Sequence, residues 1–168
     1  MLITSSRKIS IPLGKHIMIE TIVFAYDSST ECRNALQEGI ALAVHLKATC
    51  HILAVVPSPP ALSMVTGPLP EGLMERETAS INEALEQVVS YLRDKGLKVT
   101  GAVRMWEEPS EAIADFACET GADLVIVGHH QRSTLDRLLC GSVGHSLLDH
   151  LPCSLFVSMP RDTAKQDE

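Results

Sequence analysis

The sequence predicts an α/β protein, a three-layer α/β/α sandwich in which helices cover both faces of a five-stranded parallel sheet. Three observations lead to this fold class. Short apolar or β-branched runs alternate along the chain with segments of helical periodicity. Short turns connect most of these segments, as in parallel β–α units with right-handed crossovers. The length of 168 residues is ordinary for a single domain with a sizeable core.

The first β–α–β unit is predicted from residues 21–26, which are β-branched and aromatic and therefore favour a strand. The polar run 27–30 supplies a helix cap, and the helix continues to about residue 46. A second buried strand is expected at residues 50–56, where Pro57 stops it. The inward face of the helix is predicted to contain Leu36, Ile40, Ala43 and Val44.

A loop rich in proline and glycine, residues 58–72, separates this unit from a long helix at about residues 73–95. Gly96 ends the helix, and residues 99–105 alternate enough in polarity to indicate an exposed edge strand. A shorter helix begins at Pro109 and ends near residue 121. The inward residues of the two helices are predicted to be Ile81, Ala84, Leu85, Val88 and Leu92, and Ile113, Phe116 and Ala117.

The last β–α–β unit is predicted to begin at residues 124–127, an apolar run typical of a strand buried on both faces. Gly128 ends this strand, and a polar loop leads to a helix that opens at Gly141-Ser142. A final strand is predicted from Ser154 to Met159. The inward face of the last helix is predicted to contain Gly144, Leu147, Leu148 and Leu151.

Composition argues against several classes of partner. The formal net charge is -7 and aromatic residues make up 4% of the chain, which disfavours nucleic acid. No apolar run approaches the ~20 residues that span a bilayer. Five cysteines show no Cys-x-x-Cys spacing, so we expect reduced, buried thiols in a cytoplasmic protein: Cys32, Cys50, Cys118, Cys140 and Cys153.

The stretch after residue 124 has the parts of a phosphate-binding site. A strand ends at Gly128, the following loop contains Arg132, and a helix starts at Gly141-Ser142. Free N–H groups and the helix dipole at such a start attract an anion. Taken singly, these residues are better explained as a strand-ending glycine, a solvated cation and a helix cap. Their joint spacing favours a site.

This stretch resembles the nucleotide-binding signature of the universal stress protein family. The family pattern is a glycine, two residues, a second glycine, nine residues, and then Gly followed by Ser or Thr. Gly128 and Gly141-Ser142 match it, and residues 25–29 and 108–128 resemble neighbouring family segments. The resemblance implies a Rossmann-like, adenine nucleotide alpha hydrolase-like sheet with strand order 3-2-1-4-5. It also implies a family domain at 19–160 between an N-terminal extension, 1–18, and a polar tail, 161–168.

The resemblance further implies an adenine nucleotide ligand: ATP, with Mg²⁺ for the triphosphate, or AMP or ADP. Adenine would lie against the ends of the first two strands, with a carboxylate near the nucleoside that equally serves as a helix cap. It also implies a homodimer through the strand from Ser154 to Met159. The nucleotide-binding residues would be Ala25, Tyr26, Asp27, Val55, Val127, Gly128, Gln131, Arg132, Gly141, Ser142 and Val143.

Gln131 departs from the family pattern, which has its second glycine there. A glycine takes positive φ freely, whereas another residue in that conformation costs about 1–2 kcal/mol. The loop can also follow another path, or the Gln131 amide can contact the ligand. Two functions therefore stay open: an ATP-binding regulatory protein of the stress response, and a dimeric interaction module of the same fold that binds no nucleotide.

Catalysis is not expected, because no nucleophile–base pair, Walker-type loop or Gly-x-Ser-x-Gly elbow occurs in the sequence. A slow ATPase is the alternative within this fold. We interpret His129-His130 as polar loop residues rather than metal ligands, since adjacent residues of an extended loop point apart. His145 and Asp149 fit a helical ion pair or dimer contact, and Met64, Met74 and Met105 fit gap-filling core residues.

Overall fold

The computed structural model describes residues 18–27, 30–58, 70, 72–128 and 147–159. Its centre is a five-stranded sheet with the order β3-β2-β1-β4-β5, in which all neighbouring strands run parallel. The predicted strand order is thus confirmed. The predicted strand ends agree with the observed ones to within one residue: β1 Thr21–Tyr26, β2 Thr49–Pro57, β3 Val99–Trp106, β4 Leu124–Gly128 and β5 Ser154–Ser158.

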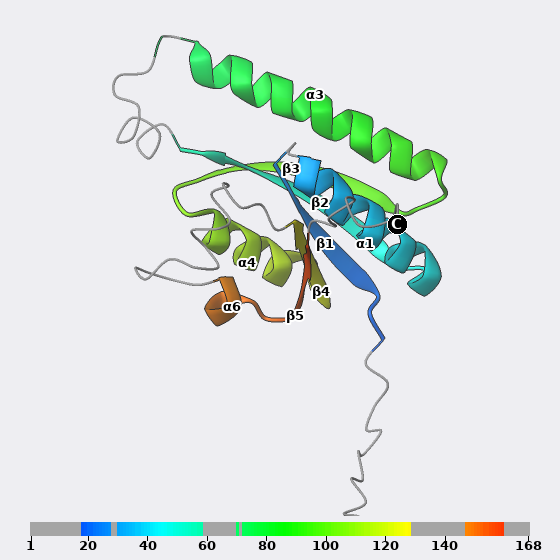
Figure 1. Cartoon of the computed structure of the whole chain (residues 1–168). Helices are drawn as coiled ribbons and strands as arrows, with labels where there is room; N and C mark the ends of the chain where they lie inside the picture. The colour runs from blue at the N-terminus through cyan, green and yellow to red at the C-terminus, as the bar shows by residue number, and fades with distance from the viewer. Residues whose placement is uncertain (1–17, 28–29, 59–69, 71, 129–146, 160–168) are drawn as a thin grey trace, which may run out of the picture.

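Helices cover both faces of this sheet (Figure 1), which confirms the three-layer sandwich. The described helices are α1 Thr30–Leu46, α3 Leu73–Asp94, α4 Pro109–Thr120 and α6 Leu147–His150. The helices α1 and α3 pack on one face, and α4 and α6 pack on the other. The predicted loop at 58–72 and the predicted helix start at Gly141-Ser142 lie mostly or wholly outside the described residues.

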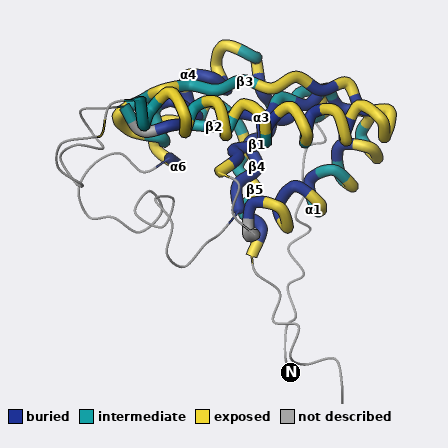
Figure 2. The backbone as a smooth tube through the Cα atoms, turned by 90° about the horizontal axis from the view of Figure 1, so that it is seen from above, coloured by how far each residue is buried: buried dark blue, intermediate teal, exposed yellow. Residues whose placement is uncertain are grey.

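The alternation of side chains along β1 divides the core between the two faces. Ile22, Phe24 and Tyr26 point to the α1/α3 face, whereas Val23 and Ala25 point to the α4/α6 face. Both sets are buried, as expected for a strand in the middle of a doubly wound sheet. Figure 2 shows the burial along the backbone, with mostly buried residues in the central strands and many exposed residues along the helices.

Three predicted core positions are wrong by a single residue. Val44 and Leu148, expected to face inward, are 52% and 63% exposed, and Cys118, expected to be a buried thiol, is exposed. Each follows a buried helical residue, namely Ala43, Leu147 or Ala117. One step along an α-helix turns the side chain by about 100°, so the buried neighbour occupies the inward position. Met105, expected to fill a gap in the core, is also exposed, because it lies on the edge strand β3.

Asp123 joins the starts of three strands. Its carboxylate Oδ2 accepts hydrogen bonds from the backbone N–H groups of Glu20, at 2.9 Å, and Thr21, at 3.0 Å. Its own N–H donates to the Thr21 carbonyl at 2.9 Å, and its carbonyl accepts from the Ser154 N–H at 3.2 Å. One residue therefore aligns β1, β4 and β5 at the amino edge of the sheet. The strands then reach the opposite edge in a fixed register.

No helix in the described part of the chain is long and apolar enough to cross a membrane. Within the same residues, no group of three or more His, Cys, Asp or Glu side chains is arranged to hold a metal ion.

Candidate functional site at the carboxyl ends of β1 and β4

The carboxyl ends of β1 and β4 meet at one edge of the sheet. Phe24 pairs with Ile126 in the parallel register, and each strand continues for two more residues, to Tyr26 and to Gly128. The chain proceeds from β1 to β2 on one side and from β4 to β5 on the other. A reversal of strand order of this kind opens a crevice at the carboxyl edge, where doubly wound proteins bind ligands. The structure thus places the two strand ends, at Tyr26 and Gly128, beside each other at this edge.

Three of the predicted site residues share one face of the sheet. Ala25 and Val127 are buried members of the core under α4 and α6, and the half-buried Val55 packs against the same core. They come from three adjacent strands, β1, β4 and β2. Val127 is 0% and Ala25 8% exposed, so of the three side chains the half-buried Val55 offers apolar surface near the carboxyl edge. Tyr26 differs from them, because its ring points to the α1/α3 face.

Asp27 is exposed immediately after β1. The first turn of α1 lies beside the end of β1, because the thiol of Cys32 donates a hydrogen bond to the Ala25 carbonyl at 3.3 Å. Burial is the main cause that raises the pKa of Cys32 to about 12, and burial also raises the pKa of Tyr26. Both groups are therefore neutral at pH 7, whereas Asp27 and Arg33 supply charge that acts on them.

The remaining predicted site residues lie outside the described residues. They are Gln131, Arg132, Gly141, Ser142 and Val143. His129, His130 and His145 lie there as well. The described half of the candidate site therefore consists of the ends of β1, β2 and β4.

We expect the cysteines to differ strongly in reactivity. Cys32 and Cys50 are buried, and burial raises their pKa values to about 12 and about 11. At pH 8 almost none of either thiol is the reactive thiolate, whereas Cys118 is exposed. Iodoacetamide at pH 8 should modify Cys118 before Cys32 and Cys50, which should react only after unfolding in urea. Peptide mass spectrometry measures each rate, and native labelling of Cys32 as fast as that of Cys118 would contradict the described packing.

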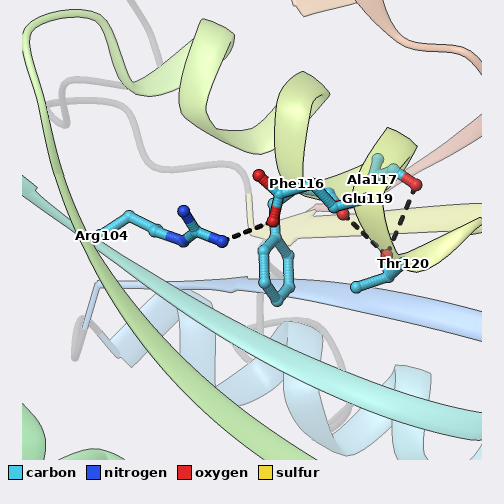
Figure 3. A network of polar contacts seen from close by, with 5 residues as sticks. All are labelled: Arg104, Phe116, Ala117, Glu119 and Thr120. Atoms are coloured by element: carbon cyan, nitrogen blue, oxygen red, sulfur yellow. Dashed lines mark hydrogen bonds and ion pairs between the residues drawn. The ribbon is translucent and has the colours of Figure 1, made fainter.

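A polar network that the sequence did not reveal lies between β3 and α4 (Figure 3). The Arg104 guanidinium pairs with the Glu119 carboxylate and lies 5.7 Å from the centre of the Phe116 ring. The Thr120 hydroxyl donates to the Phe116 carbonyl at 2.8 Å. The side chains of the ion pair are 40% and 52% exposed, so its net contribution to stability is small. The pair connects the edge strand β3 to α4.

The five-stranded parallel sheet with the order β3-β2-β1-β4-β5 and helices on both faces is a Rossmann-like α/β fold. Residues 18–158 match the model of the universal stress protein family. The chain therefore belongs to this family, as the resemblance of its signature residues predicted.

Individual relatives are distant in sequence and similar in fold. Universal stress protein MJ0531 of Methanocaldococcus jannaschii is 26% identical over 141 residues, which cover 83% of this chain and 82% of the relative. The solved structure of universal stress protein UspA from Lactobacillus plantarum has a TM-score of 0.66 at 24% identity, covering 83% of this chain and 97% of that chain.

Two further solved structures of the family are described as nucleotide complexes. A universal stress protein in complex with cAMP has a TM-score of 0.61 at 18% identity, covering 83% of this chain and 97% of that chain. The universal stress protein from Archaeoglobus fulgidus in complex with dAMP has a TM-score of 0.55 at 20% identity, covering 83% and 98%. At these identities the likeness establishes the shared fold.

Proposed function

We propose that this protein binds an adenine nucleotide, ATP in the first instance, at the carboxyl edge of β1 and β4. It would act in the cytoplasm as a regulatory protein of the stress response, through binding rather than turnover. The observation that supports this most is the meeting of Tyr26 and Gly128 at the strand reversal. The cAMP and dAMP of the two related complexes both contain adenine, which agrees with the proposed ligand class.

In this proposal the base lies against the backbone at the end of β1, and the half-buried Val55 is its apolar wall. The backbone at Tyr26 and Asp27 supplies hydrogen bonds to the edge of adenine, because a base needs donors and acceptors as well as an apolar wall. The exposed Asp27 carboxylate accepts hydrogen bonds from the nucleoside.

The phosphate half of the proposed site rests on sequence spacing. Gly128 lets the chain turn over the ribose, and the N–H groups of Gly141, Ser142 and Val143 meet the phosphates at a helix start. Arg132 neutralises phosphate charge, and a triphosphate brings Mg²⁺ with it. A ligand that binds only the folded protein stabilises it by about 2.7 kcal/mol at a hundred times its dissociation constant. A change in nucleotide concentration would thereby change the free energy of unfolding of this protein.

The first experiment is a measurement of nucleotide content and affinity. The purified full chain is denatured, released nucleotides are identified by chromatography, and the nucleotide-free protein is titrated with ATP and Mg²⁺ by calorimetry. A bound adenine nucleotide, or a dissociation constant below about 100 µM (about -5.5 kcal/mol), supports the proposal. Absence of both, with no heat up to millimolar ATP, refutes it. Phosphate release measured in the same samples tests the slow-ATPase alternative.

We expect Gln131→Gly to tighten ATP binding about tenfold, because the family pattern has glycine here and a non-glycine residue pays about 1–2 kcal/mol wherever the pattern requires positive φ. The matched control is Gln131→Ala, which removes the amide and keeps the backbone restriction, and which should leave the affinity unchanged. If the amide itself contacts the ligand, both variants weaken binding. If neither variant nor the wild type binds ATP, the protein belongs to the members that work without nucleotide.

The second candidate function, a dimeric interaction module, is favoured by the surface of β5. This strand is an edge of the sheet, and its apolar residues are only partly covered. Leu155 and Val157 are half-buried, while Phe156 is 38% and the adjacent Met159 is 59% exposed. An apolar, unpaired edge strand promotes association unless another surface covers it. We therefore propose a homodimer through the strand from Ser154 to Met159, in either candidate function.

We expect Phe156→Lys to convert this dimer into a monomer, because a buried lysine at the pairing edge would be desolvated without a partner. Sedimentation velocity over a range of protein concentrations measures the change. The matched control is Met105→Lys, which places the same charge at an exposed apolar position on the opposite edge strand. Equal association of the wild type and both variants would exclude the β5 interface.

A further inference from the structure

Two free cysteines, Cys118 and Cys153, lie on neighbouring elements at the amino edge of the sheet. Cys118 belongs to the last turn of α4, and Cys153 immediately precedes β5. The chain between them passes through β4 and α6, so the two cysteines are distant in the sequence. The candidate nucleotide site lies at the opposite, carboxyl edge and involves neither thiol.

The chain turns back against α4 directly after Cys118. The Gly121 N–H donates a hydrogen bond to the Cys118 carbonyl at 3.2 Å, and the Ala122 N–H donates to the Ala117 carbonyl at 2.9 Å. Gly121 has a positive φ of 62°, as is usual for the residue that ends a helix in this way. Ala122 is thereby held against the last turn of α4, one residue before Asp123.

Cys153 reaches the same place through the pairing of β4 with β5. The Asp123 carbonyl accepts a hydrogen bond from the Ser154 N–H at 3.2 Å, and Leu124 pairs with Ser154 in the parallel register. Continued by one residue, this register places Cys153 opposite Asp123, and neighbouring strands lie about 4.8 Å apart. Cys153 therefore lies beside the segment that turns back against Cys118.

Cys118 lies on the flank of α4 that faces away from β3. A step of about 100° per residue places Cys118 and Glu119 on opposite flanks of the helix from the buried Ile113. Glu119 pairs with Arg104 of β3, so Cys118 lies on the other flank. That flank is the side of α6, which contacts α4 and leads directly to Cys153. Figure 1 shows α4 and α6 beside each other.

The two thiols differ in exposure and act on each other. Cys118 is exposed, whereas Cys153 is half-buried and packs against the same core cluster as Ala117. Burial is the main cause that raises the pKa of Cys153, and negative charge at Asp123 and at Cys118 raises it further. Because a Coulomb interaction weakens with distance, this effect agrees with the proximity that the backbone hydrogen bonds indicate.

We propose that Cys118 and Cys153 form a redox modification site, at which a hydroperoxide converts the two thiols into an intramolecular disulfide. The Cys118 thiolate attacks one peroxide oxygen, the O–O bond breaks, and the sulfur is oxidised to a sulfenic acid while the released hydroxide takes up a proton. The Cys153 thiolate then attacks the Cys118 sulfur, the S–S bond forms, and the sulfenic oxygen leaves as water. Two thiols and one hydrogen peroxide thus give one disulfide and two molecules of water.

The order of these steps follows from exposure, because the exposed Cys118 meets the oxidant first and the half-buried Cys153 resolves the sulfenic acid. The disulfide connects the end of α4 to the start of β5. It closes a loop of the chain that contains β4, α6 and the predicted phosphate-binding residues. A cross-link of this kind restricts the unfolded chain, so the oxidised protein should be more stable than the reduced protein.

The test treats the reduced full chain with hydrogen peroxide and maps the products by peptide mass spectrometry without reduction. In the native protein, the Cys118–Cys153 disulfide should form within hours and be at least about tenfold more abundant than any other pair. Dithiothreitol should reverse it, and oxidation should raise Tm by about 5 °C or more. In urea-unfolded protein, the same treatment should give a mixture of cysteine pairs.

Three variants separate the two roles from a general reactivity of thiols. Cys153→Ser should accumulate the sulfenic acid at Cys118, where dimedone traps it. Cys118→Ser, at an exposed position, should prevent the cross-link without disturbing the core. The matched control is Cys140→Ser, which removes a thiol outside the described residues and should leave the yield of the disulfide unchanged.

Four results would overturn the proposal. They are the absence of the Cys118–Cys153 disulfide from the native protein, a disulfide that joins Cys118 chiefly to Cys140 or to a second copy of the chain, the same mixture of pairs in native and unfolded protein, and a fall in Tm on oxidation. The measurements are made without nucleotide, so failure here leaves the proposed nucleotide site untouched.

Discussion

Replacing Asp123 by alanine is expected to lower the free energy of unfolding by about 2–4 kcal/mol. The carboxylate accepts two backbone hydrogen bonds, from Glu20 and Thr21, and a hydrogen bond to a charged group contributes about 1.5–3 kcal/mol. The exposed bond to Glu20 contributes at the lower end of this range. Urea denaturation followed by circular dichroism measures the loss.

Two variants separate this anchoring role from a general effect of charge. Asp123→Asn keeps one oxygen acceptor and should lose about half as much stability as the alanine variant. Asp115→Ala removes an exposed carboxylate from α4, and its effect should stay within about 0.5 kcal/mol. If Asp123→Ala were as mild as Asp115→Ala, the three strand starts would not depend on this side chain.

Gly39→Ala is expected to destabilise the protein by about 1–3 kcal/mol, although alanine is the better helix former. A Cβ at Gly39 would lie 2.3 Å from Phe24 Cε1 and 2.7 Å from Ile126 Cδ1. Phe24 and Ile126 are each 1% exposed, so neither side chain can move aside without disturbing the core. The helix α1 would have to lift from β1 and β4.

The control for Gly39→Ala is the reverse change at a neighbouring position. Ala41 is exposed on α1, so Ala41→Gly reports helix propensity alone and should cost about 1 kcal/mol. Thermal unfolding of both variants gives the comparison. A gain in stability for Gly39→Ala would mean that α1 lies farther from the sheet than described.

The strands could be predicted closely because each is a short apolar run between clear breaks. Residues 21–26 illustrate this, since all but the first are buried and both ends agree with the structure. The bounds of the described helices were predicted about as closely as those of the strands, but some residues were assigned to the wrong face of their helix. Val44 and Leu148 are apolar and lie next to an inward residue, and composition alone does not distinguish such neighbours when a helix turns by about 100° per residue.

The candidate site could be predicted only in part, for a geometric reason. The sequence indicates which residues end β1, β2 and β4, but the face to which each side chain points depends on the pairing of strands that are distant in the chain. The structure adds that Ala25, Val55 and Val127 share one face and that Tyr26 lines a groove on the other. Contacts of long range, such as the 2.8 Å bond from the Ser158 hydroxyl to Glu38, have no periodic signal in the sequence.

The position of Asp123 has a consequence for how this chain can change over generations. Its bonds secure the amino edge of the sheet, and a strand of five residues separates that edge from the other by about 17 Å. Substitutions at such a distance usually act independently. A lineage can therefore exchange exposed residues at the carboxyl edge, such as Asp27, without weakening the scaffold. Substitutions that change ligand preference and substitutions that change folding stability can therefore occur independently of one another.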